Sequence, residues 1–129
     1  MASATPRVMF AARGGMCMNG ACFKEHVLRA DGTVSFHSNE VHAEGDPKAP
    51  VIRKATAEEL ARVDAVLGAI DVAGLEEGYG ACCNAHADGS DTYVTFYDQA
   101  GKEVRTVRVS DAPPPPLIEL IASLRDLKP

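Results

Sequence analysis

Two stretches of the chain alternate apolar and polar residues in the way that a half-buried β-strand does. The first runs over Phe23–Ala30 and Thr33–Ser38, on either side of Asp31-Gly32. An Asp-Gly dipeptide between two such runs is typical of a type I′ hairpin turn. The second runs over Asp91–Tyr97 and Glu103–Val109, with a short polar turn between them. The pattern therefore predicts two antiparallel hairpins.

Two other stretches repeat their apolar residues at helical spacing. The segment Thr56–Ile70 begins with Thr56 and Glu59, which can cap each other's backbone N–H groups in a capping box. A second helix is expected after the stiff run Pro113–Pro116, because proline is tolerated in the first turn of a helix. The predicted apolar stripes are Leu60, Val63, Leu67 and Ile70 in the first helix and Leu117, Leu120, Ile121, Leu124 and Leu127 in the second.

The remaining segments complete an α+β pattern. Arg7–Ala12 is apolar enough for a strand, which Gly14-Gly15 is expected to end, and Val51–Lys54 fits a short strand. The glycine-rich stretch Asp71–Ser90 reads as a long irregular loop. We therefore expect one domain over residues 1–129, with residues 1–5 as a flexible terminus. Its fold should be an antiparallel sheet of about five strands with two helices packed on one face.

Net charge and composition limit the classes of partner that the protein could bind. The formal net charge is −5, which argues against a nucleic-acid or anionic-membrane surface, because phosphate binding needs a basic field. No run approaches the ~20 apolar residues of a membrane span. The first five residues are too short for a signal peptide, and the small residues before Pro6 fit a chain from which a signal has been removed.

The four cysteines are the main chemical feature. Cys17 and Cys22 lie close together, and Cys82 and Cys83 are adjacent. An even count suits disulfides in an oxidising compartment. A disulfide between adjacent residues is strained, because Cα atoms across a disulfide prefer ~5.5–6 Å and neighbours in the chain lie ~3.8 Å apart. Two cross-links from Cys17 and Cys22 to Cys82 and Cys83 avoid that strain, and each is worth on the order of 4 kcal/mol.

Two alternatives use the same sulfur atoms. A thiol-based site for copper or zinc would draw on thiolate, imidazole and thioether ligands. Its candidate ligands are Cys17, Cys22, Cys82, Cys83 and His86, with Met16 and Met18 nearby. A cysteine-dependent enzyme, with His86 activating Cys83, stays open at lower weight because no hydrolase or redox signature is present.

Three other histidines are candidates for an exposed metal site. His26 and His37 lie on the two arms of the first predicted hairpin and could face each other across it, with His42 in the following loop. The simpler interpretation is that they are solvated strand and loop histidines.

The run Cys22–Phe36, C-F-K-E-H-V-L-R-A-D-G-T-V-S-F, resembles the opening of a family of small bacterial envelope domains of unknown function, often found in lipoproteins. In that family a cysteine leads a strand, a D-G-x-V turn and a second strand, followed by a capped helix, a final hairpin and a short helix. The order here is similar over most of the chain. The resemblance implies this fold and an extracytoplasmic location, and it implies no established activity.

Together these observations predict a small extracytoplasmic, disulfide-stapled binding or interaction module without catalysis and without a required cofactor. Its partner would be a protein or a small molecule.

Overall fold

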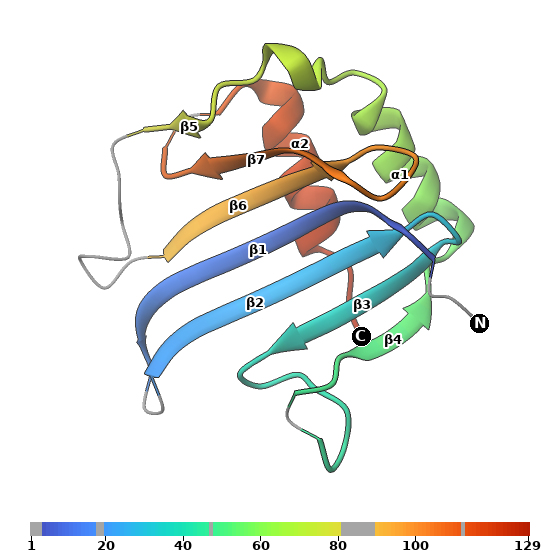
Figure 1. Cartoon of the computed structure of the whole chain (residues 1–129), viewed down its shortest axis with the longest axis vertical. Helices are drawn as coiled ribbons and strands as arrows, with labels where there is room; N and C mark the ends of the chain where they lie inside the picture. The colour runs from blue at the N-terminus through green and yellow to red at the C-terminus, as the bar shows by residue number, and fades with distance from the viewer. Residues whose placement is uncertain (1–3, 18–19, 47, 81–89, 112) are drawn as a thin grey trace.

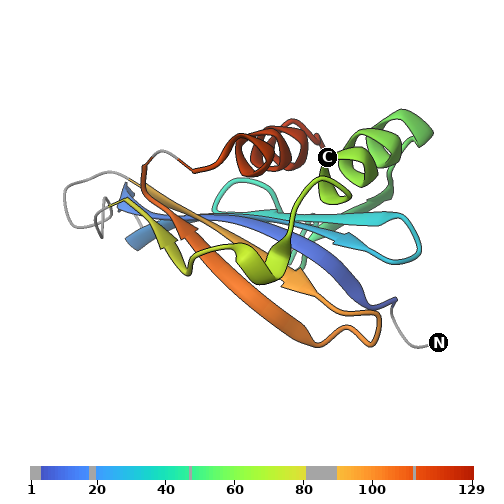
Figure 2. The ribbon, with the colours of Figure 1, turned by 90° about the horizontal axis from the view of Figure 1, so that it is seen from above.

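The computed structural model describes residues 4–17, 20–46, 48–80, 90–111 and 113–129. These residues form a seven-stranded sheet in the order β4-β3-β2-β1-β6-β7-β5, with helices α1 and α2 side by side on one face (Figures 1 and 2). The elements are β1 Pro6–Cys17, β2 Gly20–Arg29, β3 Thr33–Ser38, β4 Val51–Lys54, α1 Ala57–Leu67, the 3₁₀ turn η1 Val72–Gly74, β5 Gly78–Tyr79, β6 Ser90–Tyr97, β7 Glu103–Val109 and α2 Pro115–Arg125.

The predicted α+β class and both hairpins are confirmed, but the sheet is larger than expected and it is mixed. The additional strand, β5, has two residues and runs parallel to β7. It is held by hydrogen bonds from Arg108 N–H to the Glu77 carbonyl (2.9 Å) and from Ser110 N–H to the Tyr79 carbonyl (2.8 Å). A strand this short has no alternating pattern of its own, so only its pairing with β7 reveals it.

The predicted end of the first strand at Gly14-Gly15 is wrong. β1 continues through both glycines to Cys17. Gly14 has a φ of 118°, and the pairing with β2 becomes irregular just after it. The strand persists because Gly14 has a partner on each side, Cys22 of β2 and Ser90 of β6. Pairing on two sides thus outweighs the local tendency of glycine to break a strand.

The first hairpin turn differs in detail from the predicted type I′ turn. Gly32 N–H donates to the Arg29 carbonyl (3.0 Å), so Ala30-Asp31 is the centre of the turn and Gly32 follows it with a φ of 84°. This is the common three-residue connection, in which glycine takes the left-handed position after the turn. The Asp31 carboxylate accepts hydrogen bonds from the Thr33 backbone (2.9 Å) and hydroxyl (2.6 Å).

Both predicted helices are present. In α1 the capping box is present, with Glu59 N–H donating to Thr56 Oγ1 (3.1 Å) and Thr56 N–H to Glu59 Oε1 (2.8 Å). α2 begins at Pro115, inside the proline run rather than after it, so two prolines stand in its first turn. Both helices end before their last predicted stripe residue, α1 at Leu67 and α2 at Arg125. The two stripes differ in burial: Val63 is the one fully buried residue of α1, whereas the whole stripe predicted for the second helix is buried, with Leu127 just beyond α2. The core is formed by these side chains and by the inner sheet residues Val8, Phe10, Leu28, Val34, Phe36, Val94, Phe96 and Val107.

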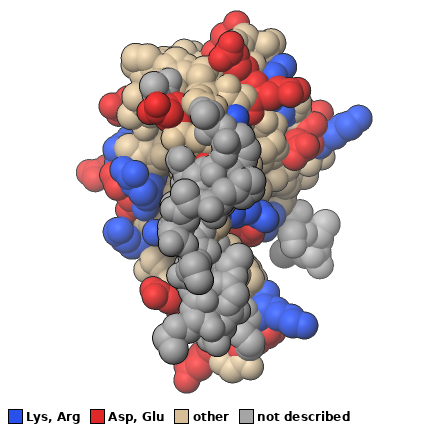
Figure 3. Space-filling model, turned by 90° about the vertical axis from the view of Figure 1, so that its left-hand side faces the viewer, with Lys and Arg blue, Asp and Glu red and all other residues tan. Residues whose placement is uncertain are grey.

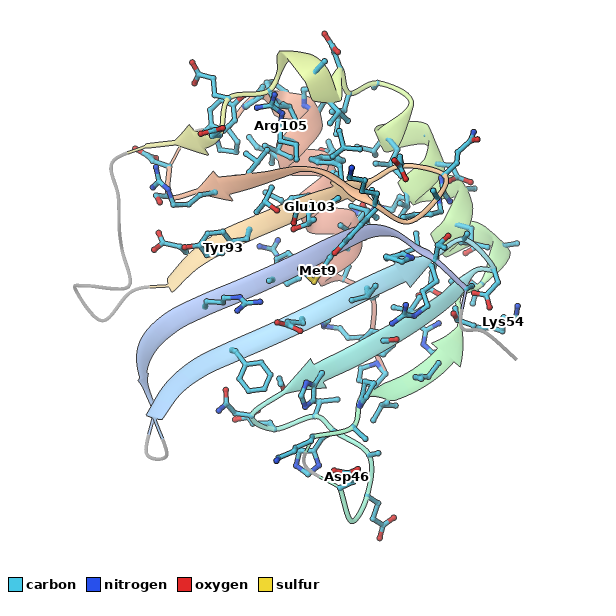
Figure 4. All side chains as sticks on the ribbon, in the orientation of Figure 1. Met9, Asp46, Lys54, Tyr93, Glu103 and Arg105 are labelled. Atoms are coloured by element: carbon cyan, nitrogen blue, oxygen red, sulfur yellow. The ribbon has the colours of Figure 1, made fainter. Side chains whose placement is uncertain are left out.

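The face of the sheet that carries no helix is covered by its own side chains. Figure 4 looks onto this face, and Tyr93 lies on it. An ion pair between Arg13 and Glu25 (2.6 Å) crosses from β1 to β2, and Ala11, flanked by Glu25 and Tyr93, is fully buried. Ser35 is also buried on this face. Its Oγ is the one sealed side-chain polar atom without a hydrogen-bond partner among the described residues.

We expect Ser35→Ala to raise the free energy of unfolding by about 1 kcal/mol, because it removes a buried hydroxyl that has no partner. Urea unfolding measures the change. The control is Ser38→Ala in the same strand, where Oγ accepts the N–H groups of Glu40 (3.1 Å) and Val41 (2.8 Å), so a loss of about 1 kcal/mol is expected. A Ser35→Ala variant less stable than the parent would contradict the assignment.

Candidate functional site

The structure places the predicted cysteine residues only in part. The β1–β2 register puts Cys17 opposite Gly20 and Cys22 opposite Gly14. Cys82, Cys83 and His86 lie outside the described residues, as do the side chains of Cys17, Cys22, Met16 and Met18. The predicted disulfides and the alternative metal site therefore stay predictions.

The β1–β2 hairpin that carries Cys17 and Cys22 lies at the same end of the sheet as the strands that precede and follow residues 81–89. Gly14 pairs with Cys22 on one side and with Ser90 on the other. Tyr79 pairs with Val109, which lies opposite Thr92, so β5 ends and β6 begins at this same end of the sheet (Figure 1). Seen from this side, Lys and Arg are interspersed with Asp and Glu over the described surface (Figure 3).

The three remaining histidines do not form the site that the sequence suggested. His37 lies opposite Glu25, and His26 lies opposite Phe36. His42 is in the following loop, where its Nδ1 lies 3.2 Å from the Ala43 carbonyl. Within the described ranges, no group of three or more His, Cys, Asp or Glu side chains could hold a metal ion. The interpretation of His26 as a solvated strand histidine is wrong, because only 4% of it is exposed.

His26 lies beneath the end of α2, between two aromatic rings. Its ring centroid is 5.5 Å from that of Phe10 and 4.9 Å from that of Phe36. Nδ1 lies 2.8 Å from the Leu124 carbonyl. A carbonyl can only accept a hydrogen bond, so Nδ1 carries the proton and Nε2 of the neutral ring is left as an acceptor. The first role of His26 is thus structural, since it satisfies a carbonyl in the last turn of α2.

The surroundings of His26 favour the neutral imidazole. Burial lowers the pKa of His26 below its usual value of 6.5, because the charged form loses hydration. The hydrogen bond to Leu124 acts in the opposite direction with a smaller effect, and the positive charges of Lys24 and Lys128 lower the pKa further. At neutral pH, therefore, His26 presents a lone pair rather than a positive charge.

A pocket of about 210 Å³ opens beside this ring. Because His26 is buried while Lys24 and Lys128 are exposed, the imidazole lies at the floor and the lysines at the mouth. Nε2 has no hydrogen-bond partner within the described part of the chain, and it is not among the sealed unpartnered atoms. Since His26 lines the pocket, Nε2 is the ring atom that could accept a hydrogen bond from a ligand bound there. Its lining residues are Lys24, His26, Phe36, His37, Ser38, Val41, Leu127, Lys128 and Pro129. This cavity is named the His26 pocket.

Arg53 holds one wall of the His26 pocket in place. Its guanidinium forms two hydrogen bonds with the Glu59 carboxylate, each of 2.8 Å, and its Nε donates to the Lys128 carbonyl (2.6 Å). It also lies 5.4 Å from the centre of the Phe36 ring. The Arg53 guanidinium lowers the pKa of Glu59 to about 2, so this pair stays charged at neutral pH. The segment after α2 is thereby fixed to β4 and α1.

A larger hollow of about 580 Å³ lies at the other end of α2. It is more open, and its charged lining residues, Asp71 and Glu76, are exposed. The His26 pocket is the better candidate for a small-molecule site, because a buried, oriented polar group converges with charged groups on apolar walls. One feature of the sequence could have indicated this site. His26 and Leu28 are two residues apart on β2, so their side chains lie on the same, inner face of the sheet.

No protein-family model matches the chain, and a comparison with curated proteins finds no match. The resemblance to bacterial envelope domains therefore stays a prediction. None of the helices in the described ranges is long and apolar enough to cross a membrane.

We expect the protein to lose stability as the pH falls below about 6.5, the usual pKa of histidine, because the unfolded chain then binds a proton that buried His26 resists. The loss continues down to the lowered pKa of His26 in the folded state. His26→Asn, which can keep the hydrogen bond to Leu124, should cost about 2 kcal/mol at pH 7.5 through lost packing.

The test is urea unfolding of the parent and the variant at pH 7.5 and pH 5. The other histidines are present in both proteins, so their contributions cancel when the two changes in stability are compared. The parent should lose more stability than the variant between the two pH values. An equal loss would contradict the buried neutral state of His26.

Proposed function

We propose that this chain is a non-catalytic binding module and that its ligand site is the His26 pocket. The observation that carries the proposal is the position of His26, a buried imidazole that lines an apolar pocket with lysines at its mouth and whose Nε2 is the acceptor nitrogen. Apolar walls with a few well-placed polar groups are typical of small-molecule sites. Because the hydrogen bond to Leu124 fixes the tautomer, the imidazole is suited to accepting a hydrogen bond from a ligand.

The pocket also defines the chemistry of the ligand. Phe36, Val41 and Leu127 line it with apolar surface, which suits a flat apolar body. Nε2 at the floor calls for an O–H or N–H donor at one end of that body. Lys24 and Lys128 call for an anionic group at the other end. A volume of about 210 Å³ is below the ~300 Å³ at which drug-sized sites begin, so the ligand is a small hydroxyaryl carboxylate or a molecule of similar size and polarity.

We expect 4-hydroxybenzoate to bind in this pocket about fivefold more tightly than benzoate, because only the former can donate a hydrogen bond to Nε2. Amide chemical shifts in an NMR titration report both the affinity and the location, and should change mainly between residues 24 and 41 and after residue 124. The uncharged 4-hydroxybenzamide should bind more weakly than 4-hydroxybenzoate, because it leaves the lysines unpaired.

Two variants separate the contributions to this affinity. His26→Asn should remove the preference for 4-hydroxybenzoate over benzoate. Lys24→Gln should weaken 4-hydroxybenzoate about threefold, whereas Lys102→Gln, which removes the same charge from the exposed turn between β6 and β7, should leave it unchanged. Equal binding of the two acids to the parent, or shifts centred elsewhere, would exclude this ligand class.

We also propose that the cysteines staple the hairpin end of β1–β2 to residues 81–89, and that the protein works in an extracytoplasmic, oxidising compartment. The shared end of the sheet supports this pairing. So does the hairpin register, because Cys17 lies opposite Gly20 rather than Cys22. Diagonal neighbours in a hairpin are ~7–8 Å apart, which exceeds the usual Cα separation of ~4.4–6.8 Å in a disulfide.

Intact mass in denaturant without reductant should be lower than the reduced mass by the hydrogens of two disulfides. A digest should then link peptides containing Cys17 or Cys22 to the peptide containing Cys82 and Cys83. Four titratable thiols with stoichiometric zinc or copper, released on alkylation, would instead support the thiol-based metal site and contradict the staple.

A further inference from the structure

A second concave surface lies between the end of α1 and the beginning of α2. Two hollows of about 580 and 370 Å³ adjoin each other at Ala69 and Pro116, which line both. Residues that follow η1 close its other side. We name this surface the α1–α2 groove. It is separated from the His26 pocket by the length of α2, since the groove contains Leu117 and the pocket contains Leu127.

The walls of the α1–α2 groove are apolar and conformationally restricted. Pro113, Pro114 and Pro116 form one wall, and their φ angles are fixed by the pyrrolidine ring. Tyr79 contributes an aromatic ring, and its hydroxyl accepts a hydrogen bond from the Glu76 backbone N–H (3.0 Å). A surface that is ordered beforehand loses little conformational entropy when a partner binds.

All charged residues that line this groove carry the same sign. They are Asp71, Glu76 and Glu119, and no Lys or Arg side chain lines either hollow within the described ranges. None of the three forms a salt bridge with another described residue, whereas Asp64, Glu59 and Asp126 elsewhere on the helices do. The groove thus combines an apolar floor with an unneutralised acidic rim, in a chain whose net charge is −5.

We propose that the α1–α2 groove binds an extended segment of a partner protein in which an apolar or aromatic side chain is flanked by Lys or Arg. The apolar side chain fills the space beside Ala69 and Leu75, and the flanking cations pair with Asp71, Glu76 and Glu119. Charge complementarity sets this choice of partner. Side-chain contacts dominate, because the proline wall has no N–H to donate and cannot extend a partner strand.

The test uses three synthetic peptides with a fluorescent label: Gly-Arg-Leu-Phe-Arg-Gly, its charge-reversed form Gly-Glu-Leu-Phe-Glu-Gly, and Gly-Arg-Ser-Ser-Arg-Gly without the apolar pair. Fluorescence anisotropy measures affinity, and amide chemical shifts locate the site. The first peptide should bind about tenfold more tightly than either control. Its affinity should fall as salt rises, because the ion pairs at the rim are exposed.

A matched pair of variants ties binding to the groove. Ala69 is exposed and lines both hollows, so Ala69→Arg should fill the groove, offset part of its negative charge and weaken the first peptide about tenfold. Ala61→Arg places the same side chain at an exposed position of α1 that does not line the groove, and should leave affinity unchanged. Circular dichroism checks that both variants fold.

Three outcomes overturn the proposal. Equal affinity of the first peptide for Ala69→Arg and Ala61→Arg would show that it binds elsewhere. Equal affinity of the parent for the first and the charge-reversed peptide would contradict the electrostatic argument. Absence of peptide binding, together with self-association in sedimentation that Ala69→Arg abolishes, would assign the groove to a second copy of this chain. The result is independent of the His26 pocket, because 4-hydroxybenzoate binding should be the same in Ala69→Arg and the parent.

Discussion

The packing of α2 on the inner face of the sheet is the contact on which the rest of the structure depends. Leu117, Leu120, Ile121 and Leu124 of α2 and Leu127 just after it are all buried, and each such side chain stabilises the fold by roughly 1.5–3 kcal/mol. A helix that ends in the interior leaves carbonyl groups that need donors. The Leu124 carbonyl accepts the Leu127 N–H (3.3 Å) and the Nδ1–H of His26 (2.8 Å), which is on the central part of the sheet. The packing of α2 on the sheet therefore also buries and orients the imidazole of His26.

Opposite charges gather at the two ends of α2. Asp71 and Glu76 lie around its first turn, and Lys24 and Lys128 lie beyond its last turn. This is the distribution that the helix dipole favours, because its N-terminus is partly positive and its C-terminus partly negative. One helix thus separates two concave surfaces of opposite electrostatic character. Under the two proposals above, an anionic ligand and a basic peptide segment would bind at separate sites on one small domain.

The elements with strong local signals were predictable, and those that rest on pairing were not. The capping box at Thr56 and Glu59 and the α2 stripe follow from spacing within one helix, so the sequence reveals them. The continuation of β1 through Gly14 and the parallel strand β5 depend on partners far away in the chain. The His26 pocket belongs to the second group: its residues come from β2, β3, the following loop and the segment after α2.

By itself the sequence determined the α+β class, the two hairpins, both helices and the acidic character of the chain, because each arises from local periodicity or from composition. Only the tertiary structure decided the size and mixed direction of the sheet and the environment of each titratable group. Burial and the Leu124 carbonyl make His26 a neutral acceptor, and neither can be inferred from residues 24–28 alone. The reason is physical: hydration and hydrogen bonding at a site depend on what packs against it.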